Sequence, residues 1–148
     1  MTVVQLKPRI LLIEDDPGRI EVFTRWLADT EFVLVVARSG GQALGMLSKG
    51  AEGVAGLLLD HDLSDSPLTT TDMTLSASNV LPSIQRRLPR QVPILIHSHN
   101  LNKPVTMQRA LESAGFSVTR IRFATLVKDE SFFRRWIEDV RDSWDPEA

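Results

Sequence analysis

The segment Gly56-Leu57-Leu58-Leu59-Asp60-His61-Asp62-Leu63 decides the fold. An apolar run this short, ending abruptly in charged residues, is typical of a strand that is buried on both faces and brings its last side chains to a sheet edge. Two carboxylates that flank an imidazole carry a desolvation cost which a closed core does not compensate. We therefore expect Asp60, His61 and Asp62 to face a cleft, a cation or both.

The remainder of the chain alternates between strand-like and helix-like segments. Short aliphatic or alternating runs predict strands over residues 10–13, 32–36, 54–59, 92–96 and 116–123. Apolar residues at helical spacing, with capping residues at the ends, predict helices over residues 17–28, 39–50, 80–88, 104–115 and 129–144. Because parallel neighbours need right-handed helical crossovers, this alternation predicts an α/β fold with a doubly wound, five-stranded parallel sheet of order 2-1-3-4-5 between two layers of helices.

Such sheets bind ligands outside the carboxyl ends of their strands, where the strand order reverses. The run 10–13 is followed by Glu14, Asp15 and Asp16, so the pairs Asp15/Asp16 and Asp60/Asp62 are expected to meet at this edge. Converging carboxylates repel one another unless a cation binds or protons are taken up. The sequence therefore predicts a divalent cation there, with Mg²⁺ the first choice for an oxygen donor set.

Composition narrows the classes of protein that fit. The 148 residues suit one domain over residues 1–148, and the net charge of -2 gives no global attraction to nucleic acid or to an anionic membrane. The absence of cysteine excludes disulfides, thiolate metal sites and thiol nucleophiles. The amino-terminal segment fits neither a secretory signal nor a membrane span, so we expect a cytoplasmic protein.

All three histidines of the chain lie at two predicted strand ends: His61 in the opening segment, and His97 and His99 in His97-Ser98-His99-Asn100. Imidazole favours Mn²⁺ or another transition metal over Mg²⁺ and also serves as a general acid or base. His97 and His99 are therefore candidates for catalysis, and His61 for orienting a neighbour or holding the metal. The polar segment 64–78 has the length of a lid or binding loop.

The chain resembles the receiver domains of two-component response regulators over nearly its whole length. The resemblance rests on Ile10-Leu11-Leu12-Ile13-Glu14-Asp15-Asp16, on Ala37-Arg38-Ser39-Gly40-Gly41-Gln42-Ala43-Leu44 and on Leu57-Leu58-Leu59-Asp60. It implies the flavodoxin-like sandwich, with Asp15 and Asp16 holding a divalent cation and Asp60 as the phosphoacceptor. Ser98 stands at the position of the switch Ser or Thr.

Two features depart from an ordinary receiver. The Lys that receivers place at the end of the fifth strand is missing from Arg120-Ile121-Arg122-Phe123-Ala124, and a long polar segment follows the phosphoacceptor strand. The segments Leu59-Asp60-His61-Asp62-Leu63 and Ile96-His97-Ser98-His99-Asn100 instead resemble a divergent branch, the cyclic-phosphate-processing receiver-like domains. Arg120 or, preferably, Arg122 could clamp a phosphate in place of the Lys.

Two functions remain open at this point. One is metal-dependent processing or sensing of a cyclic phosphate, as a phosphohydrolase or phosphodiesterase with Asp60, His97 and His99 in catalysis and Asp62, Ser98, Asn100 and Arg122 around a small molecule or an RNA end. The other is a stand-alone response regulator, phosphorylated on Asp60 by a histidine kinase in a phosphorelay. Neither function requires a membrane or a DNA-binding domain. Any exposed part of the aromatic residues in the last predicted helix could form the face of a homodimer.

Overall fold

The computed structural model describes residues 7–60, 77–98 and 106–144. Its five strands form one parallel sheet in the order β2-β1-β3-β4-β5, as the sequence predicted. The strands are β1 (Arg9–Ile13), β2 (Val33–Ala37), β3 (Val54–Asp60), β4 (Ile94–Ser98) and β5 (Val118–Arg122). The strand order reverses between β1 and β3, so the carboxyl ends of these two strands flank the crevice in which such sheets bind ligands.

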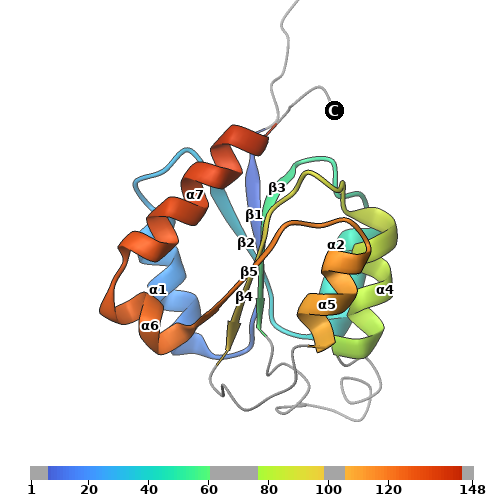
Figure 1. Cartoon of the computed structure of the whole chain (residues 1–148), viewed down its shortest axis with the longest axis horizontal. Coiled ribbons are helices and arrows are strands. Elements are labelled where there is room, and N and C mark those ends of the chain that lie inside the picture. The colour runs from blue at the N-terminus through green and yellow to red at the C-terminus, as the bar shows by residue number, and fades with distance from the viewer. Residues whose placement is uncertain (1–6, 61–76, 99–105, 145–148) are drawn as a thin grey trace, which may run out of the picture.

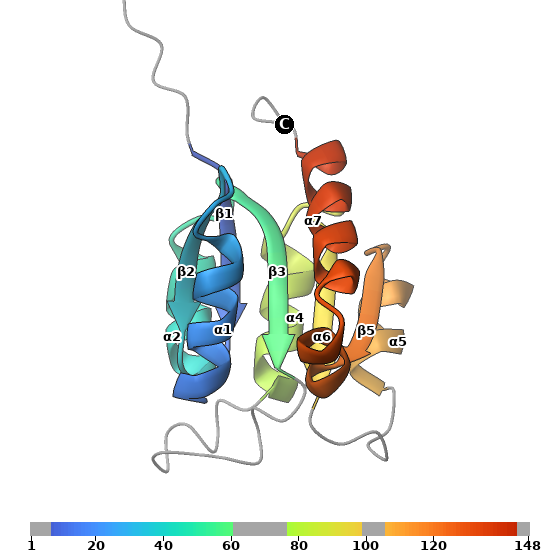
Figure 2. The ribbon, with the colours of Figure 1, turned by 90° about the vertical axis from the view of Figure 1, so that its left-hand side faces the viewer.

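Helices cover both faces of the sheet (Figure 1). On one face lie α1 (Pro17–Leu27), α6 (Phe123–Lys128) and α7 (Ser131–Ser143), and on the other lie α2 (Gly40–Ser48), α4 (Ala77–Arg87) and α5 (Thr106–Ser113). All neighbouring strands are parallel, so the strands end at the same edge of the sheet, where the arrowhead of β3 points in Figure 2. Of the described helices, none is long and apolar enough to cross a membrane.

The sheet separates two apolar clusters because successive side chains of a strand point to opposite faces. In β3, Leu57 and Leu59 pack with α2, α4 and α5, whereas Leu58 packs with α1 and α7. All seven residues of β3 are buried, as expected for the central strand of a parallel sheet with helices on both faces.

Local signals explain where several elements begin and end. Asp16 and Ser39 are the N-caps of α1 and α2, and their side chains accept hydrogen bonds from the backbone N–H groups of Arg19 and Gln42. Gly50 and Gly115 have φ values of 123° and 102°, the left-handed region that ends a helix most readily with glycine.

Three of the differences from the predicted boundaries bear on the site or on the packing. β4 extends to Ser98, so His97 lies inside the strand rather than in the loop that follows it. α4 begins at Ala77 and contains Pro82 as its sixth residue, although the sequence suggested that a helix with Pro82 starts closer to it. Residues from Phe123 onward form α6 instead of continuing β5 or a loop, and Leu126, which is fully buried, anchors this short helix to the sheet.

The contact between β3 and α7 depends on Gly56. A Cβ atom at this position would lie 2.9 Å from Ile10 Cδ1, 3.0 Å from Trp136 Cη2 and 3.1 Å from Val140 Cγ2. The absence of a side chain therefore lets α7 approach the central strand closely.

Replacing Gly56 by alanine will lower the free energy of unfolding by about 1–3 kcal/mol, because three well-packed side chains must move. Gly45→Ala is the matched control: it lies within α2 and a Cβ there meets nothing within 4 Å, so it should be neutral or stabilise by up to about 1 kcal/mol. Urea unfolding of both variants measures the difference. Equal stabilities would show that α7 does not need this close approach.

Candidate metal centre at the carboxyl edge of the sheet

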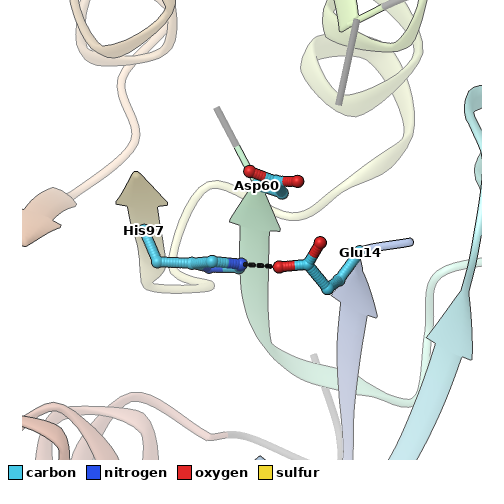
Figure 3. Close-up of side chains that lie close together, drawn as sticks. All are labelled: Glu14, Asp60 and His97. Carbon is cyan, nitrogen blue, oxygen red and sulfur yellow. Dashed lines mark hydrogen bonds and ion pairs between the residues drawn. The ribbon is translucent and has the colours of Figure 1, made fainter. Parts of the chain in front are cut away.

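Three side chains converge where β1, β3 and β4 end. Glu14 follows β1 directly, Asp60 ends β3 and His97 is the penultimate residue of β4 (Figure 3). One ligand atom from each lies within 4.8 Å of the others, and all three residues are buried, with 0%, 1% and 0% exposed surface. These strand ends therefore bring together one compact group of side chains that could hold a metal ion.

The alternation of strand side chains accounts for this convergence. Each of the three residues follows, two positions later, a leucine that packs on the α1 and α7 side of the sheet: Leu12, Leu58 and Leu95. Asp60 is moreover the direct register partner of His97 across β3 and β4. Glu14, Asp60 and His97 therefore face the same side of the sheet, the side that α1 and α7 cover.

Glu14 accepts several hydrogen bonds at the centre of the group. Its Oε2 accepts from the backbone N–H groups of Asp15 at 2.9 Å and Asp16 at 3.1 Å, and from Arg19 Nη2 at 3.2 Å. Its Oε1 accepts from Arg19 Nε at 2.6 Å and lies 2.9 Å from His97 Nε2. Burial alone raises the pKa of Glu14, but His97 and Arg19 outweigh it and hold that pKa far below its usual value. Glu14 is therefore a carboxylate, held in its ionised form.

Arg19 links the two carboxylates of the group. It lies in the first turn of α1, its side chain is only 13% exposed, and its Nη2 lies 3.6 Å from Asp60 Oδ2 in addition to its two bonds with Glu14. Burial lowers the pKa of Arg19, but the bonds and charge of Glu14, with the charge of Asp60, outweigh it and raise that pKa above its usual value. Arg19 is therefore held in its charged form.

His97 is enclosed by aromatic rings. The centroid of its ring lies 5.0 Å from that of Phe23 in α1 and 6.4 Å from that of Phe123 in α6. Glu14 on one side and these rings on the other fix the orientation of the imidazole. A buried, oriented imidazole of this kind suits a metal ligand better than a residue that exchanges protons with solvent.

Asp15 and Asp16, which the sequence proposed as metal ligands, lie beside this group. Asp16 Oδ2 accepts from Arg19 N at 2.8 Å as the cap of α1. Asp15 is half-buried, and burial, followed by the charge of Glu14, raises the pKa of Asp15. Among the described residues it is Glu14 that meets Asp60 and His97. The role of Asp15 and Asp16 as ligands stays a prediction.

The two arginines of β5 lie on a different side of the sheet. Val118 packs with the α2, α4 and α5 cluster, whereas Ile121 and Phe123 pack with the α1 and α7 cluster. Because side chains alternate along a strand, Arg120 and Arg122 leave the backbone on the same face as Val118, opposite to Glu14 and His97. Arg122 is exposed and pairs in register with Ser98, so it shares the carboxyl edge with the site. Its proposed contact with a phosphate stays a prediction.

The remaining predicted site residues fall outside the described residues. These are His61, Asp62, His99 and Asn100, together with the side chain of Ser98.

The sequence interpretation missed two residues, Glu14 and Arg19. Glu14 lies two residues after Leu12, which packs on the α1 and α7 side of the sheet. This alternation is the signal that distinguishes Glu14 from Asp15. Arg19 lies five residues after Glu14, in the first turn of the following helix, and its long side chain reaches back to the strand end.

No protein-family model and no curated protein matches the chain. Several solved structures are similar to the chain. The signal receiver domain of an HD domain-containing protein from Pseudomonas fluorescens Pf-5 is similar with a TM-score of 0.65 at 15% identity, over 97% of this chain and 93% of that one. A CheY-like response regulator receiver domain from Methanospirillum hungatei JF-1 gives 0.65 at 15% identity, over 92% and 95%.

A third similar structure contains a metal ion. The receiver domain of a sensor histidine kinase from Pseudomonas aeruginosa PAO1, with a magnesium ion coordinated in its active site cleft, gives a TM-score of 0.59 at 20% identity, over 88% of this chain and 98% of that one. These likenesses agree with the strand order and the layers of helices. The chain has the fold of the CheY-like receiver domains.

Proposed function

We propose that this protein is a divergent receiver-like domain that binds a divalent metal ion and processes or senses a phosphate-containing ligand, in the class of cyclic phosphates. The observation that carries the proposal is the convergence of Glu14, Asp60 and His97, whose ligand atoms lie within 4.8 Å of one another. Three buried polar residues at one strand edge are costly to a fold and are typical of a functional site.

The donor set fits a transition metal better than it fits magnesium. Two carboxylates are compatible with Mg²⁺, which usually keeps several waters and one or two carboxylates. An imidazole nitrogen shifts the preference toward Mn²⁺, Fe²⁺ or Zn²⁺. Glu14, Asp60 and His97 are the residues that would hold the ion, and Mn²⁺ is a suitable probe because it accepts both oxygen and nitrogen ligands.

The residues around this centre have distinct tasks in the proposal. A bound divalent ion supplies Lewis-acid activation of a phosphoryl oxygen and of water. Glu14 Oε1 lies 2.9 Å from His97 Nε2, and this contact fixes the orientation of the imidazole. Until an ion binds, Arg19 balances the charge of the carboxylates. Because His97 is buried and held in place, we assign proton transfer to His99 rather than to His97.

The alternative is a response regulator that a histidine kinase phosphorylates on Asp60. One observation favours it: Asp60 ends β3 in a fold shared with receiver domains. Against it, Asp60 is only 1% exposed and lies 3.6 Å from Arg19, and the fifth strand presents arginines rather than the receiver lysine.

The proposed function predicts metal-dependent turnover of 2′,3′-cyclic nucleotides. With Mn²⁺ in a panel of metals, the protein should bind one equivalent by calorimetry and open the cyclic phosphate, and Asp60→Asn should lose both. Asp139→Asn, an exposed position on α7, is the control that should keep both. No binding and no turnover with any metal would contradict the proposal.

Acetyl phosphate distinguishes the alternative. If intact-mass measurement shows one phosphoryl group added, and Asp60→Asn abolishes the addition, the signalling function is supported instead.

A further inference from the structure

We propose that Arg19 is the site's own counter-cation and competes with the divalent metal for Glu14 and Asp60, so that it sets the metal affinity. This inference rests on the proposed function, because it concerns the same three residues. It differs from that function in what it predicts: removing a positive charge will strengthen the binding of a positive ion to this centre.

The guanidinium of Arg19 lies close to both carboxylates. Arg19 Nη2 lies 3.2 Å from Glu14 Oε2 and 3.6 Å from Asp60 Oδ2, and Arg19 Nε lies 2.6 Å from Glu14 Oε1. A metal ion held by the two carboxylates would need their oxygens at roughly 2.0–2.6 Å. The guanidinium nitrogen therefore lies between the two carboxylates that would hold the ion.

The acceptor sites of the Glu14 carboxylate are already in use. An ionised carboxylate offers about four acceptor sites. Two backbone N–H groups, the two nitrogens of Arg19 and His97 already surround it. The backbone donors belong to the turn before α1 and are fixed by the fold. Arg19 is the partner that can move away, because its side chain is 13% exposed and its guanidinium is carried on flexible methylene groups.

The charge of the two carboxylates can be balanced either by Arg19 or by a divalent ion. Glu14 and Asp60 together carry two negative charges, and Arg19 neutralises one of them. A divalent ion that replaces the guanidinium neutralises both carboxylates. If the guanidinium stayed, the ion would meet a positive charge only a few ångström away in a site shielded from water, which weakens its binding. Metal and Arg19 thus exclude each other.

A purely structural Arg19 makes the opposite prediction. If the residue only ties α1 to the end of β1, its loss would loosen the carboxylates and weaken metal binding or leave it unchanged. The two accounts differ in the sign of the effect on the dissociation constant.

The test is a calorimetric titration of Mn²⁺ into the wild-type protein, Arg19→Gln and Arg25→Gln. Arg25 is an exposed residue near the end of the same helix and serves as the matched control. We expect Arg19→Gln to bind Mn²⁺ at least about tenfold more tightly than the wild type, a difference of about 1.4 kcal/mol. Arg25→Gln should bind as the wild type does.

Melting temperatures keep the test decisive if Arg19→Gln is unstable without metal. Saturating Mn²⁺ should then raise the melting temperature of Arg19→Gln more than that of the wild type. Equal or weaker binding by Arg19→Gln, with equal or smaller thermal shifts, would overturn the inference and leave the proposed function standing. Binding by Arg19→Gln alone would support the inference but contradict the proposed function of the wild-type chain, and binding by neither would contradict both.

Discussion

Replacing Glu14 by alanine will lower the free energy of unfolding by about 3–5 kcal/mol, the range for breaking a buried ion pair by removing one partner. Glu14 is fully buried and accepts from two backbone N–H groups, from Arg19 and from the imidazole edge of His97. Each of these donors would lose its bond to Glu14. Urea unfolding followed by fluorescence of the three tryptophans measures the loss.

Glu21→Ala is the matched control, since Glu21 is an exposed residue of α1; surface changes of this kind stay within about 0.5 kcal/mol. If Glu14→Ala lost no more than Glu21→Ala, Glu14 would not organise the strand edge.

Acid provides a second measure of the same residue. The pKa of Glu14 is lower in the folded protein than its usual value of 4.5. Its ionised form therefore stabilises the fold fully above about pH 4.5, and this contribution is lost as the pH falls through the folded-state pKa. The stability difference between the wild type and Glu14→Gln should shrink as the pH falls below about 4.5. A difference independent of pH would mean that the charge of Glu14 does not matter.

Replacing His97 by glutamine will change which metals the protein binds. The imidazole is the donor that distinguishes the site from an all-oxygen magnesium site. Changes even to groups behind a metal ligand commonly cost 10–100-fold in affinity, so we expect His97→Gln to lose at least about tenfold in affinity for Mn²⁺ and Zn²⁺. Affinity for Mg²⁺ should change much less. Calorimetric titrations with the three metals give the comparison.

Ser83→Ala controls for the loss of a buried polar group, because Ser83 is 5% exposed and lies on α4, which covers the opposite face of the sheet. It should leave the metal affinities unchanged. A uniform loss for Mg²⁺, Mn²⁺ and Zn²⁺ in His97→Gln would show that His97 supports the fold and does not select the metal.

The sequence was sufficient to predict the sheet and the edge at which polar residues gather. Aliphatic runs that stop abruptly at acids or histidines mark both the buried strands and their carboxyl ends, so Asp60 and His97 were expected to approach each other before their register was known. Burial on both faces leaves a short run such as Leu57-Leu58-Leu59 few alternatives to a central strand.

The choice among three consecutive acids could not be made from composition. Glu14, Asp15 and Asp16 differ in role because one faces the sheet, one is half-buried and one caps α1. That assignment depends on where β1 stops alternating and α1 begins, a matter of one residue. The sequence pattern did not resolve it.

Two further features depend on tertiary contacts. α6 has only six residues and no side-chain cap, so its formation depends on packing, mainly through Leu126. The reach of Arg19 back to Glu14 and Asp60 depends on side-chain conformation, which periodicity does not encode. Both lie near the candidate metal centre, whose details the sequence therefore predicted least well.

The most direct test of the metal centre is a crystal of the protein soaked with Mn²⁺ and measured for anomalous scattering. We expect one strong anomalous peak at the ends of β1, β3 and β4, within metal-ligand distance of Glu14, Asp60 and His97, with the guanidinium of Arg19 moved away from both carboxylates. A structure without such a peak, in which Arg19 still joins Glu14 to Asp60, would contradict this expectation.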